Sequence, residues 1–326
     1  MAYTSFDQSA TDQMARSVAV YEQRRAARSR LLRFRHNMVW TEHPDGTHLH
    51  RVDTVTGELV ADLGLKSEKL IDLHRSHSDQ QSEARHLDAE SVKQLNQVQR
   101  DNVAFGTARV PSIVVNILEV LWNQNLMDFY RVIGTHALYA YESAAGVTFD
   151  PPTMATNDVD LLWDVQKRVK FLQLMKSADL SMIDVLRMAD PTFQRDEDNK
   201  ESAINDSAFS VDFLRRQQPE PEPDAFPISG KDGDVFPVKA KRAELFLSAR
   251  LFEQPIVGLD GRMTCMRTIN PQTFVEFKLW MSEQPDREFL KKGRDRRQAE
   301  AVQQLIDEGR LKPSADVGAS RVTCTK

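Results

Sequence analysis

The segment "TNDVDLLWD", residues 156–164, constrains the fold of this chain more than any other stretch. Apolar residues alternate there with Asp158 and Asp160, which is the pattern of a strand with one buried face. Residues two positions apart on a strand point the same way, so both carboxylates would share one surface while Val159 and Leu161 enter the core. Two carboxylates held this close repel each other unless a cation lies between them. The segment therefore predicts a strand that carries a divalent metal site, with Mg²⁺ or Mn²⁺ as the ion.

A second motif precedes this strand. The stretch "FYRVIGTHALYAYESAAGV", residues 129–147, contains a short β-favouring run, a break at Gly134 and Thr135, and a helical run that Gly146 would end. We therefore predict a strand, a tight turn and a helix in that order. Free backbone N–H groups at such a turn, together with the positive end of the helix, can bind phosphate groups.

A third motif, "FSVDFLRR" at residues 209–216, repeats the apolar–Asp–apolar pattern at Asp212. An adjacent strand could bring this acid to the same metal ions as Asp158 and Asp160, and three acids suit two-metal phosphoryl transfer. Each motif alone has an ordinary explanation, because a lone D-x-D pair usually marks an edge strand or a turn. Their order along one chain is harder to obtain by chance and favours a functional site.

The composition sets broad limits on the class of protein. The chain has 326 residues, enough for about two domains, with 40% hydrophobic and 28% charged residues and a formal net charge of −5. These values are typical of an ordinary globular chain and not of a disordered, collagen-like or bulk nucleic-acid-binding one. Cys265 and Cys324 form neither a disulfide framework nor a C-x-x-C metal site, which indicates a reducing compartment. There is no apolar N-terminal signal segment and no apolar run of about 18 residues, so we predict a cytoplasmic protein without membrane contact.

The order of helical and strand-like patterns predicts three parts. Residues 1–105 form an accessory module with a helix over 10–35, a small β-meander over 38–60, and a long helix or helical hairpin over 66–105. Residues 106–216 form an α/β core, and the Pro-rich stretch "QQPEPEPDAFPISG" begins a mainly helical module over 217–326. The helical patterns expected in these last two parts cover residues 110–126 and 165–177, "AELFLSARLF" (243–252), "QTFVEFKLWMSEQ" (272–284) and "DREFLKKGRDRRQAEAVQQLIDEG" (286–309).

The three motifs together resemble the polymerase-β-type nucleotidyltransferase superfamily, whose pattern is hG[GS], then [DE]h[DE]h, then h[DE]h, where h is apolar. More narrowly, the chain is similar to a bacterial family with G-T-x-A-L-Y-A-Y-E-x-A-A-G-V at this position. The likeness covers about residues 105–300 and is most specific over 132–164. The sequence has Thr where most of the superfamily has Ser, which keeps the hydroxyl, and a longer separation between the turn and D-x-D than minimal members have.

This resemblance implies an α/β (α+β) nucleotidyltransferase fold, with a mixed sheet flanked by helices, an N-terminal helix and β-meander, and C-terminal helices. It also implies that Gly134 and Thr135 form the phosphate-binding turn and that Asp158, Asp160 and Asp212 are the metal ligands. Mg²⁺ or Mn²⁺ would be the cofactor, and an NTP, ATP among them, would be the substrate.

Four residues near the C-terminus add a weaker resemblance. Lys278, Arg287, Lys291 and Asp295 occur in an order similar to the K…R…K…D pattern of nucleotidyltransferase toxins of abortive-infection systems. The resemblance implies that Lys278 and Lys291 contact the triphosphate, and it makes one half of a toxin–antitoxin or defence pair, with a protein partner, an alternative for the whole protein. Basic residues on a terminal helix are more often merely exposed to solvent, so both interpretations stay open here.

Five histidines, His43, His48, His50, His74 and His77, raise the question of a zinc site. His48 and His50 would share a strand face, but no Cys or acid completes the usual ligand spacing. We therefore expect exposed hairpin histidines without a metal.

The functional hypothesis is transfer of a nucleoside monophosphate from an NTP to an acceptor hydroxyl, with release of pyrophosphate. The acceptor is unidentified and could be RNA, a protein or a small molecule. The alternatives are a nucleotide-binding regulatory or toxin and defence component without catalysis, a metal-dependent phosphohydrolase, and an RNA-binding protein led by the basic N-terminal helix with Arg24, Arg25 and Arg28.

Overall fold

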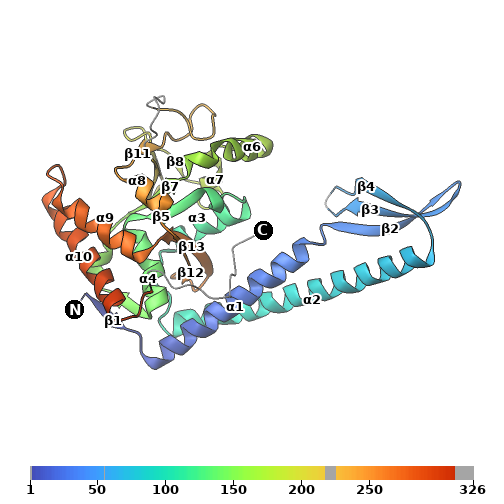
Figure 1. The fold of residues 1–326 in the computed structure, drawn as a ribbon, viewed down its shortest axis with the longest axis horizontal. Coiled ribbons are helices and arrows are strands. Elements are labelled where there is room, and N and C mark those ends of the chain that lie inside the picture. The colour runs from blue at the N-terminus through green and yellow to red at the C-terminus, as the bar shows by residue number, and fades with distance from the viewer. Residues whose placement is uncertain (1, 55, 217–224, 313–326) are drawn as a thin grey trace. The chain divides into compact units, whose positions relative to one another are not determined.

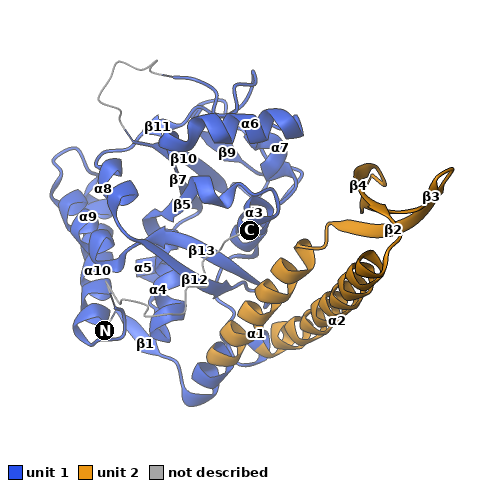
Figure 2. Ribbon diagram, turned by 45° about the vertical axis from the view of Figure 1, so that its right-hand side comes forward, with its two compact units in different colours: residues 1–14, 102–319 blue, residues 15–101, 320–326 orange. Residues whose placement is uncertain are grey.

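The computed structural model describes residues 2–54, 56–216 and 225–312. The chain divides into two compact units (Figure 2): residues 1–14 with 102–319, and residues 15–101 with 320–326. The boundary that we predicted between residues 216 and 217 borders residues 217–224, which lie outside the described residues. The described residues that follow that gap belong to the first unit.

The second unit consists of two helices and a small sheet (Figure 1). Helix α1 (Gln8–Leu32) continues into it from the first unit, and α2 (Glu68–Ala104) is a single long helix. The strands β2 (His36–His43), β3 (Gly46–Asp53) and β4 (Leu59–Leu65) pair antiparallel in chain order. The predicted N-terminal helix and β-meander are therefore confirmed, and residues 66–105 form one helix instead of a hairpin.

The basic face of α1 pairs with acids of α2. Arg24 forms a salt bridge with Asp88, and Arg30 forms one with Glu83 at 2.8 Å. Both pairs lie within the second unit. Because at least part of its positive charge is neutralised inside the protein, α1 is a weaker candidate for binding RNA than its sequence alone indicates.

The first unit is built on a mixed sheet, and the structure describes eight strands of it. The strands lie in the order β12-β13-β5-β7-β10-β9-β8, and β11 pairs with β10. Strand β10 runs parallel to β7, whereas β5 runs antiparallel to it. The strand bounds are β5 (Tyr130–Ile133), β7 (Asp158–Trp163), β8 (Gln194–Arg195), β9 (Ser202–Ile204), β10 (Ser210–Arg215), β11 (Val238–Lys239), β12 (Leu251–Val257) and β13 (Met263–Ile269). A separate pair joins β1 (Tyr3–Ser5) to β6 (Val147–Phe149).

Helices cover both faces of this sheet (Figures 1 and 2). One face packs against α3 (Ser112–Asn123), α6 (Arg168–Ala178) and α7 (Met182–Arg187). The other packs against α4 (Ala137–Ala145), α9 (Pro271–Glu283) and α10 (Phe289–Asp307). The shorter helical segments are η1 (Met127–Phe129), η2 (Gly134–His136), α5 (Pro151–Met154), η3 (Val165–Lys167) and α8 (Ala243–Ser248). The predicted α/β class, with a mixed sheet flanked by helices, is confirmed.

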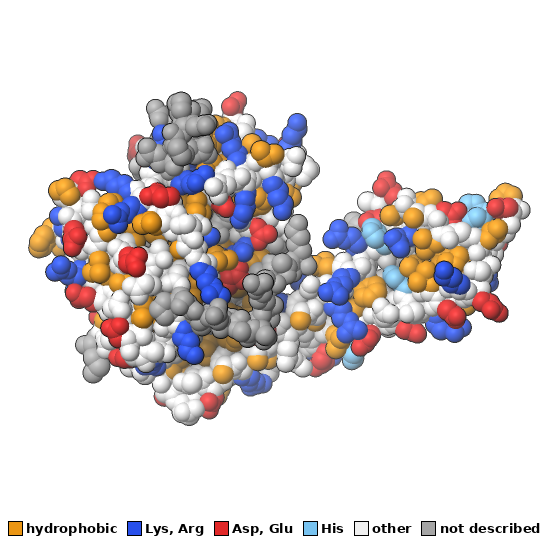
Figure 3. Space-filling model, in the orientation of Figure 1, with side chains coloured by type: hydrophobic (Ala, Val, Ile, Leu, Met, Phe, Trp, Pro, Cys, Tyr) orange, Lys and Arg blue, Asp and Glu red, His pale blue; other side chains and the backbone are white. Residues whose placement is uncertain are grey.

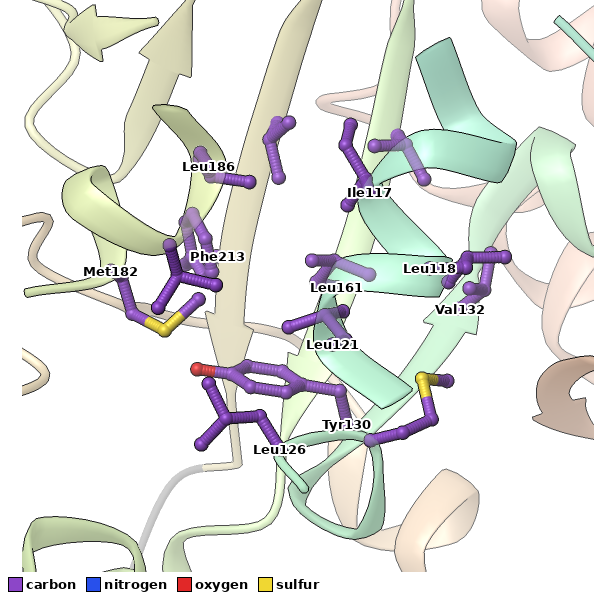
Figure 4. Packing of buried hydrophobic residues seen from close by; sticks show 14 of the residues in the cluster. Ile117, Leu118, Leu121, Leu126, Tyr130, Val132, Leu161, Met182, Leu186 and Phe213 are labelled. Carbon is purple, nitrogen blue, oxygen red and sulfur yellow. The ribbon is translucent and has the colours of Figure 1, made fainter. Parts of the chain in front are cut away.

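The core under α3 is a continuous apolar cluster (Figure 4). It joins residues of the helices to alternate residues of the central strands, because only every second side chain of a strand faces α3. Burial of this much apolar surface is the main favourable contribution to folding. The labelled members in Figure 4 are Ile117, Leu118, Leu121, Leu126, Tyr130, Val132, Leu161, Met182, Leu186 and Phe213.

The hairpin of β12 and β13 differs from the sequence-based expectation. The stretch "AELFLSARLF" was expected to be helical throughout, but α8 ends at Ser248 and β12 begins at Leu251. Strand β12 lies at the end of the sheet order, where Pro255 is tolerated because an edge strand has backbone groups that need no partner. Its residues from Leu251 to Val257 pair antiparallel with β13.

No helix among the described residues combines the length and apolar character that a membrane crossing requires. Cys265 is buried and reduced, and Cys324 lies outside the described residues.

Candidate active site

Three acidic side chains meet on the sheet face that α4, α9 and α10 cover. Asp158 and Asp160 lie on β7, where they alternate with Val159 and Leu161, which are 1% and 0% exposed. Asp212 lies on the neighbouring parallel strand β10, directly beside Asp160 in the register. One carboxylate oxygen from each acid can be chosen so that all three lie within 4.8 Å of one another. Strand alternation and parallel pairing together bring the three predicted acids into one cluster.

Neighbouring hydroxyl groups orient two of these acids. Ser202 lies opposite Asp212 on the antiparallel strand β9, and its Oγ donates a hydrogen bond to Asp212 Oδ1 at 2.7 Å. The hydroxyl of Thr156 donates to Asp158. Each hydroxyl satisfies one oxygen lone pair, and a carboxylate has several more for a ligand. The acids are thus held in place without being neutralised.

The electrostatics of the cluster disfavour negative charge. Burial, together with the charges of Asp158 and Asp212, raises the pKa of Asp160 to about 7, against a lowering by Lys278 and Arg287. Burial also raises the pKa of Asp212, although the hydrogen bond from Ser202 opposes this shift. A bound cation would therefore stabilise the ionised form of these carboxylates.

The Gly-Thr turn lies against these acids. Gly134 has φ +67°, a left-handed conformation that favours glycine. A Cβ atom at this position would lie 1.9 Å from Asp160 Oδ2, so the contact also excludes any side chain. The turn begins η2 and leads into α4, which ends at Gly146 with φ +64° as expected. Glycine at position 134 thus lets the backbone approach the carboxylate cluster closely.

Thr135 is held from α10. The amide Nε2 of Gln298 donates to Thr135 Oγ1 at 3.1 Å and to the backbone oxygen of Thr153 at 2.8 Å. The next residue, His136, is buried, and burial lowers its pKa to about 4. His136 is therefore neutral near pH 7 and adds no positive charge to the turn.

A buried ion network lies behind the acids. Asp295 of α10 is 0% exposed and accepts hydrogen bonds from Lys278 Nζ and Arg287 Nε, both at 2.8 Å. Lys278 on α9 is 5% exposed, and burial lowers its pKa. Lys291 lies elsewhere on α10 and forms a partly exposed salt bridge with Glu288 at 3.3 Å. Three of the four residues in the predicted K…R…K…D order thus share one network, and Lys291 contacts Glu288 instead.

Two pockets open beside the carboxylates. One has a volume of about 390 Å³ and is lined by Asp158 and Asp212 together with polar residues of the loop and strands that follow α7. The other has a volume of about 510 Å³ and shares Asn157 with the first. Its wall combines apolar side chains such as Phe209 with side-chain amides such as Asn205. An acidic pocket next to a mixed apolar and amide pocket has room for a ligand with a charged part and a less polar part.

Sequence reasoning missed the residues that support the site. Gln298 and Ser202 lie in no motif, Thr156 was given no role although it begins the segment 156–164, and Gln298 is 163 positions away from Thr135 in the chain. Only Thr156 carried a local signal, because it precedes Asp158 by two residues.

Comparison with known proteins identifies a family. A model of the family described as nucleotidyltransferase matches residues 112–321. The matched range contains the turn at Gly134, the three clustered acids and the network around Asp295. None of the curated proteins and none of the solved structures gives a significant match.

Proposed function

This chain belongs to the nucleotidyltransferase family, and we propose that it transfers a nucleoside monophosphate from an NTP to an acceptor hydroxyl. The family implies an NTP substrate. The observation that carries the proposal is the cluster of Asp158, Asp160 and Asp212 within 4.8 Å beside the backbone of Gly134. Carboxylates and a phosphate-binding turn in contact are the two parts that phosphoryl transfer from a nucleotide needs.

The acids suit a hard divalent cation. All three offer oxygen ligands, which Mg²⁺ and Mn²⁺ prefer, and burial together with the charges of Asp158 and Asp212 raises the pKa of Asp160. Asp158 and Asp160 would hold the metal ions together with Asp212. When bound, a divalent cation neutralises negative charge on the triphosphate and the charge that develops on the acceptor oxygen.

The chain's own residues would position the reacting groups. Backbone N–H groups of the turn at Gly134 and Thr135 would bind the triphosphate. Asp212 would orient the acceptor hydroxyl and receive its proton. The acceptor oxygen forms a bond to the α-phosphorus, the bond from that phosphorus to the bridging oxygen of the β-phosphate breaks, and the electron pair leaves with pyrophosphate.

Lys278 and Lys291 are proposed to contact the triphosphate. The ammonium group of Lys278 carries three N–H donors, and Asp295 accepts one of them. Lys291 would have to exchange its exposed partner Glu288 for a phosphate. An ion pair at the surface contributes little stability, so such an exchange costs little.

The experiment that tests this function follows the label of α-³²P-NTPs. The purified full chain is incubated with each NTP in turn, with Mg²⁺ or Mn²⁺, and with total cellular RNA and protein as acceptors. The Asp158→Asn/Asp160→Asn variant removes two ligands, and Asp179→Asn makes the same chemical change at an exposed helix end. Transfer of label by the wild type and by Asp179→Asn, but not by the double variant, is the expected result.

Three other outcomes would change the conclusion. Full metal-dependent turnover by the double variant would overturn the assignment of the site. NTP binding without transfer to any acceptor would favour a regulatory nucleotide-binding protein, such as one component of a toxin or defence pair with a protein partner. Release of phosphate or nucleoside monophosphate without a labelled acceptor would indicate a phosphohydrolase.

A further inference from the structure

The β-meander of the second unit contains a second group of side chains with metal-ligand chemistry. His48 and His50 of β3 and Asp62 of β4 offer atoms that all lie within 4.8 Å of one another. Antiparallel pairing puts Asp62 directly beside His50, although they are twelve positions apart in sequence. The expectation that these histidines are exposed is wrong for His50, which is 8% exposed. The acid that the sequence spacing lacked is therefore supplied by the neighbouring strand.

A third imidazole extends the group. His43 lies at the end of β2, and its Nε2 is 3.2 Å from Nε2 of His50. The ring of His43 also lies near that of His48, with 4.9 Å between the centroids. The side chains thus come from all three strands of the meander: His43 from β2, His48 and His50 from β3, and Asp62 from β4.

The spacing of the ligand atoms fits a tetrahedral site. Zinc binds nitrogen and carboxylate oxygen at about 2.0–2.2 Å, so its ligand atoms lie roughly 3.3–3.5 Å apart. His48 Nδ1 is 2.9 Å from Asp62 Oδ2, and His50 Nε2 is 3.8 Å from Asp62 Oδ1. The Nε2 atoms of His43 and His50 are 3.2 Å apart. These distances bracket the tetrahedral value. His43 lies close to His50 and would turn toward His48 and Asp62 to become the fourth ligand.

The outer contacts are also those of a metal site. The second ring nitrogen of His48 lies 3.2 Å from the carboxylate of Asp45, and Asp62 accepts a hydrogen bond from the backbone of Gly64 at 2.8 Å. A histidine that binds a metal commonly donates its other ring N–H to a carboxylate, which fixes the orientation of the ring. With His48 Nδ1 directed at an ion, Asp45 would have that role.

We propose that His43, His48, His50 and Asp62 bind a transition-metal cation of the Zn²⁺ type, and that this ion ties the three strands together. Imidazole nitrogens favour Zn²⁺ over Mg²⁺, in contrast to the all-oxygen cluster of the first unit. A three-stranded sheet of this size has little core of its own, and Leu59, Val60 and Leu65 are each about half exposed. Figure 3 shows histidine and apolar side chains at the surface of the meander. A bound metal would stabilise such a sheet because the site forms only on folding.

The test is a titration of the full chain, prepared without an affinity tag, with Co²⁺ in excess Mg²⁺. Tetrahedral Co²⁺ has a strong visible absorption that octahedral Co²⁺ lacks, so the readout is independent of enzymatic activity. We expect one Co²⁺ per chain, displaced by Zn²⁺. His48→Asn and Asp62→Asn each remove one ligand and should weaken binding by about a hundredfold. His86→Asn removes an exposed histidine of α2 and should bind as the wild type does.

The variants must be shown to be folded by circular dichroism before titration. Asp160→Asn should keep the Co²⁺ spectrum, because it alters only the acids of the first unit. The proposal is overturned if the wild type shows no tetrahedral spectrum and Zn²⁺ does not raise its melting temperature. It is equally overturned if folded His48→Asn and Asp62→Asn bind Co²⁺ as tightly as His86→Asn does.

Discussion

Asp160 and Asp295 are two carboxylates of the first unit with opposite surroundings. Asp295 lies in a fully buried position and accepts hydrogen bonds from two basic side chains, Lys278 and Arg287. Asp160 lies beside two further acids, and burial together with their charges raises its pKa to about 7, against a lowering by Lys278 and Arg287. A buried carboxylate with built-in cations is a structural element, whereas a cluster without them needs a cation from outside. The proposed site is the place where the protein leaves charge uncompensated.

The first prediction concerns the cluster of three acids. Asp158→Asn should lower kcat for nucleotidyl transfer by about 10²–10³-fold or more, because a preorganised charge at the reacting phosphate is lost. The rate of pyrophosphate release with saturating NTP measures it, and Asp179→Asn should be unaffected. A near-normal rate for Asp158→Asn would remove Asp158 from the metal ligands.

The second prediction concerns Asp295 and its basic partners. Asp295→Asn leaves buried Lys278 without its counter-charge, and the free energy of unfolding should fall by about 3–5 kcal/mol. Urea denaturation measures this change. Lys278→Met combined with Asp295→Leu should recover part of the loss, since it removes the buried charge of Lys278 as well as its partner. If Asp295→Asn unfolds at the wild-type urea concentration, the network is not structural.

The third prediction sharpens the contrast through pH. The pKa of Asp160 is raised from 3.8 to about 7, so ionisation of this acid destabilises the fold. The cost is absent below the unfolded pKa, grows as pH rises, and is complete above about 7. Asp160→Asn should therefore stabilise the metal-free protein by about 2–4 kcal/mol at pH 8 and by less than half as much at pH 5.

Thermal unfolding with a chelator present, at both pH values, checks this third prediction. Added Mg²⁺ should stabilise the wild type and reduce the difference from Asp160→Asn. Equal stability of the two proteins at pH 8 would contradict the raised pKa.

The smallest expected effect concerns Lys291. Its salt bridge with Glu288 is about half exposed on both sides, so Lys291→Ala should change the free energy of unfolding by about 0.5 kcal/mol or less. If Lys291 contacts the triphosphate, loss of that contact in Lys291→Ala should raise KM for the NTP by about tenfold or less, with kcat little changed. Steady-state kinetics separate the two effects, and Lys292→Ala on the same helix is the matched control. An unchanged KM would confine phosphate binding to the turn and Lys278.

Much of the site could be predicted from local pattern. The alternation of Asp158 and Asp160 with apolar residues is a property of any half-buried strand, and so is the apolar–Asp–apolar pattern at Asp212. The same reasoning found the turn at Gly134, because a glycine between a β-favouring run and a helical run is typical of a tight turn. The carboxylate cluster of the first unit follows from such local rules plus one pairing of strands.

The supporting contacts could not be predicted in this way. The stretch over residues 243–252 was expected to be helical, yet it divides into α8 and the start of β12, which pairs with β13. Lys278 and Asp295 formed part of a recognised order, but the order alone did not reveal that they bind each other.

The sequence by itself determined the α/β class, the three acids and the turn. These features depend on patterns a few residues long, which follow directly from the backbone geometry of strands, turns and helices. Only the tertiary structure decided which distant groups meet: Gln298 with Thr135, Asp295 with Lys278, and Asp62 with His48. The physical reason is that burial of the whole core determines how strands pair and helices pack. The spacing of polar residues in the sequence does not indicate which distant group each of them will bind.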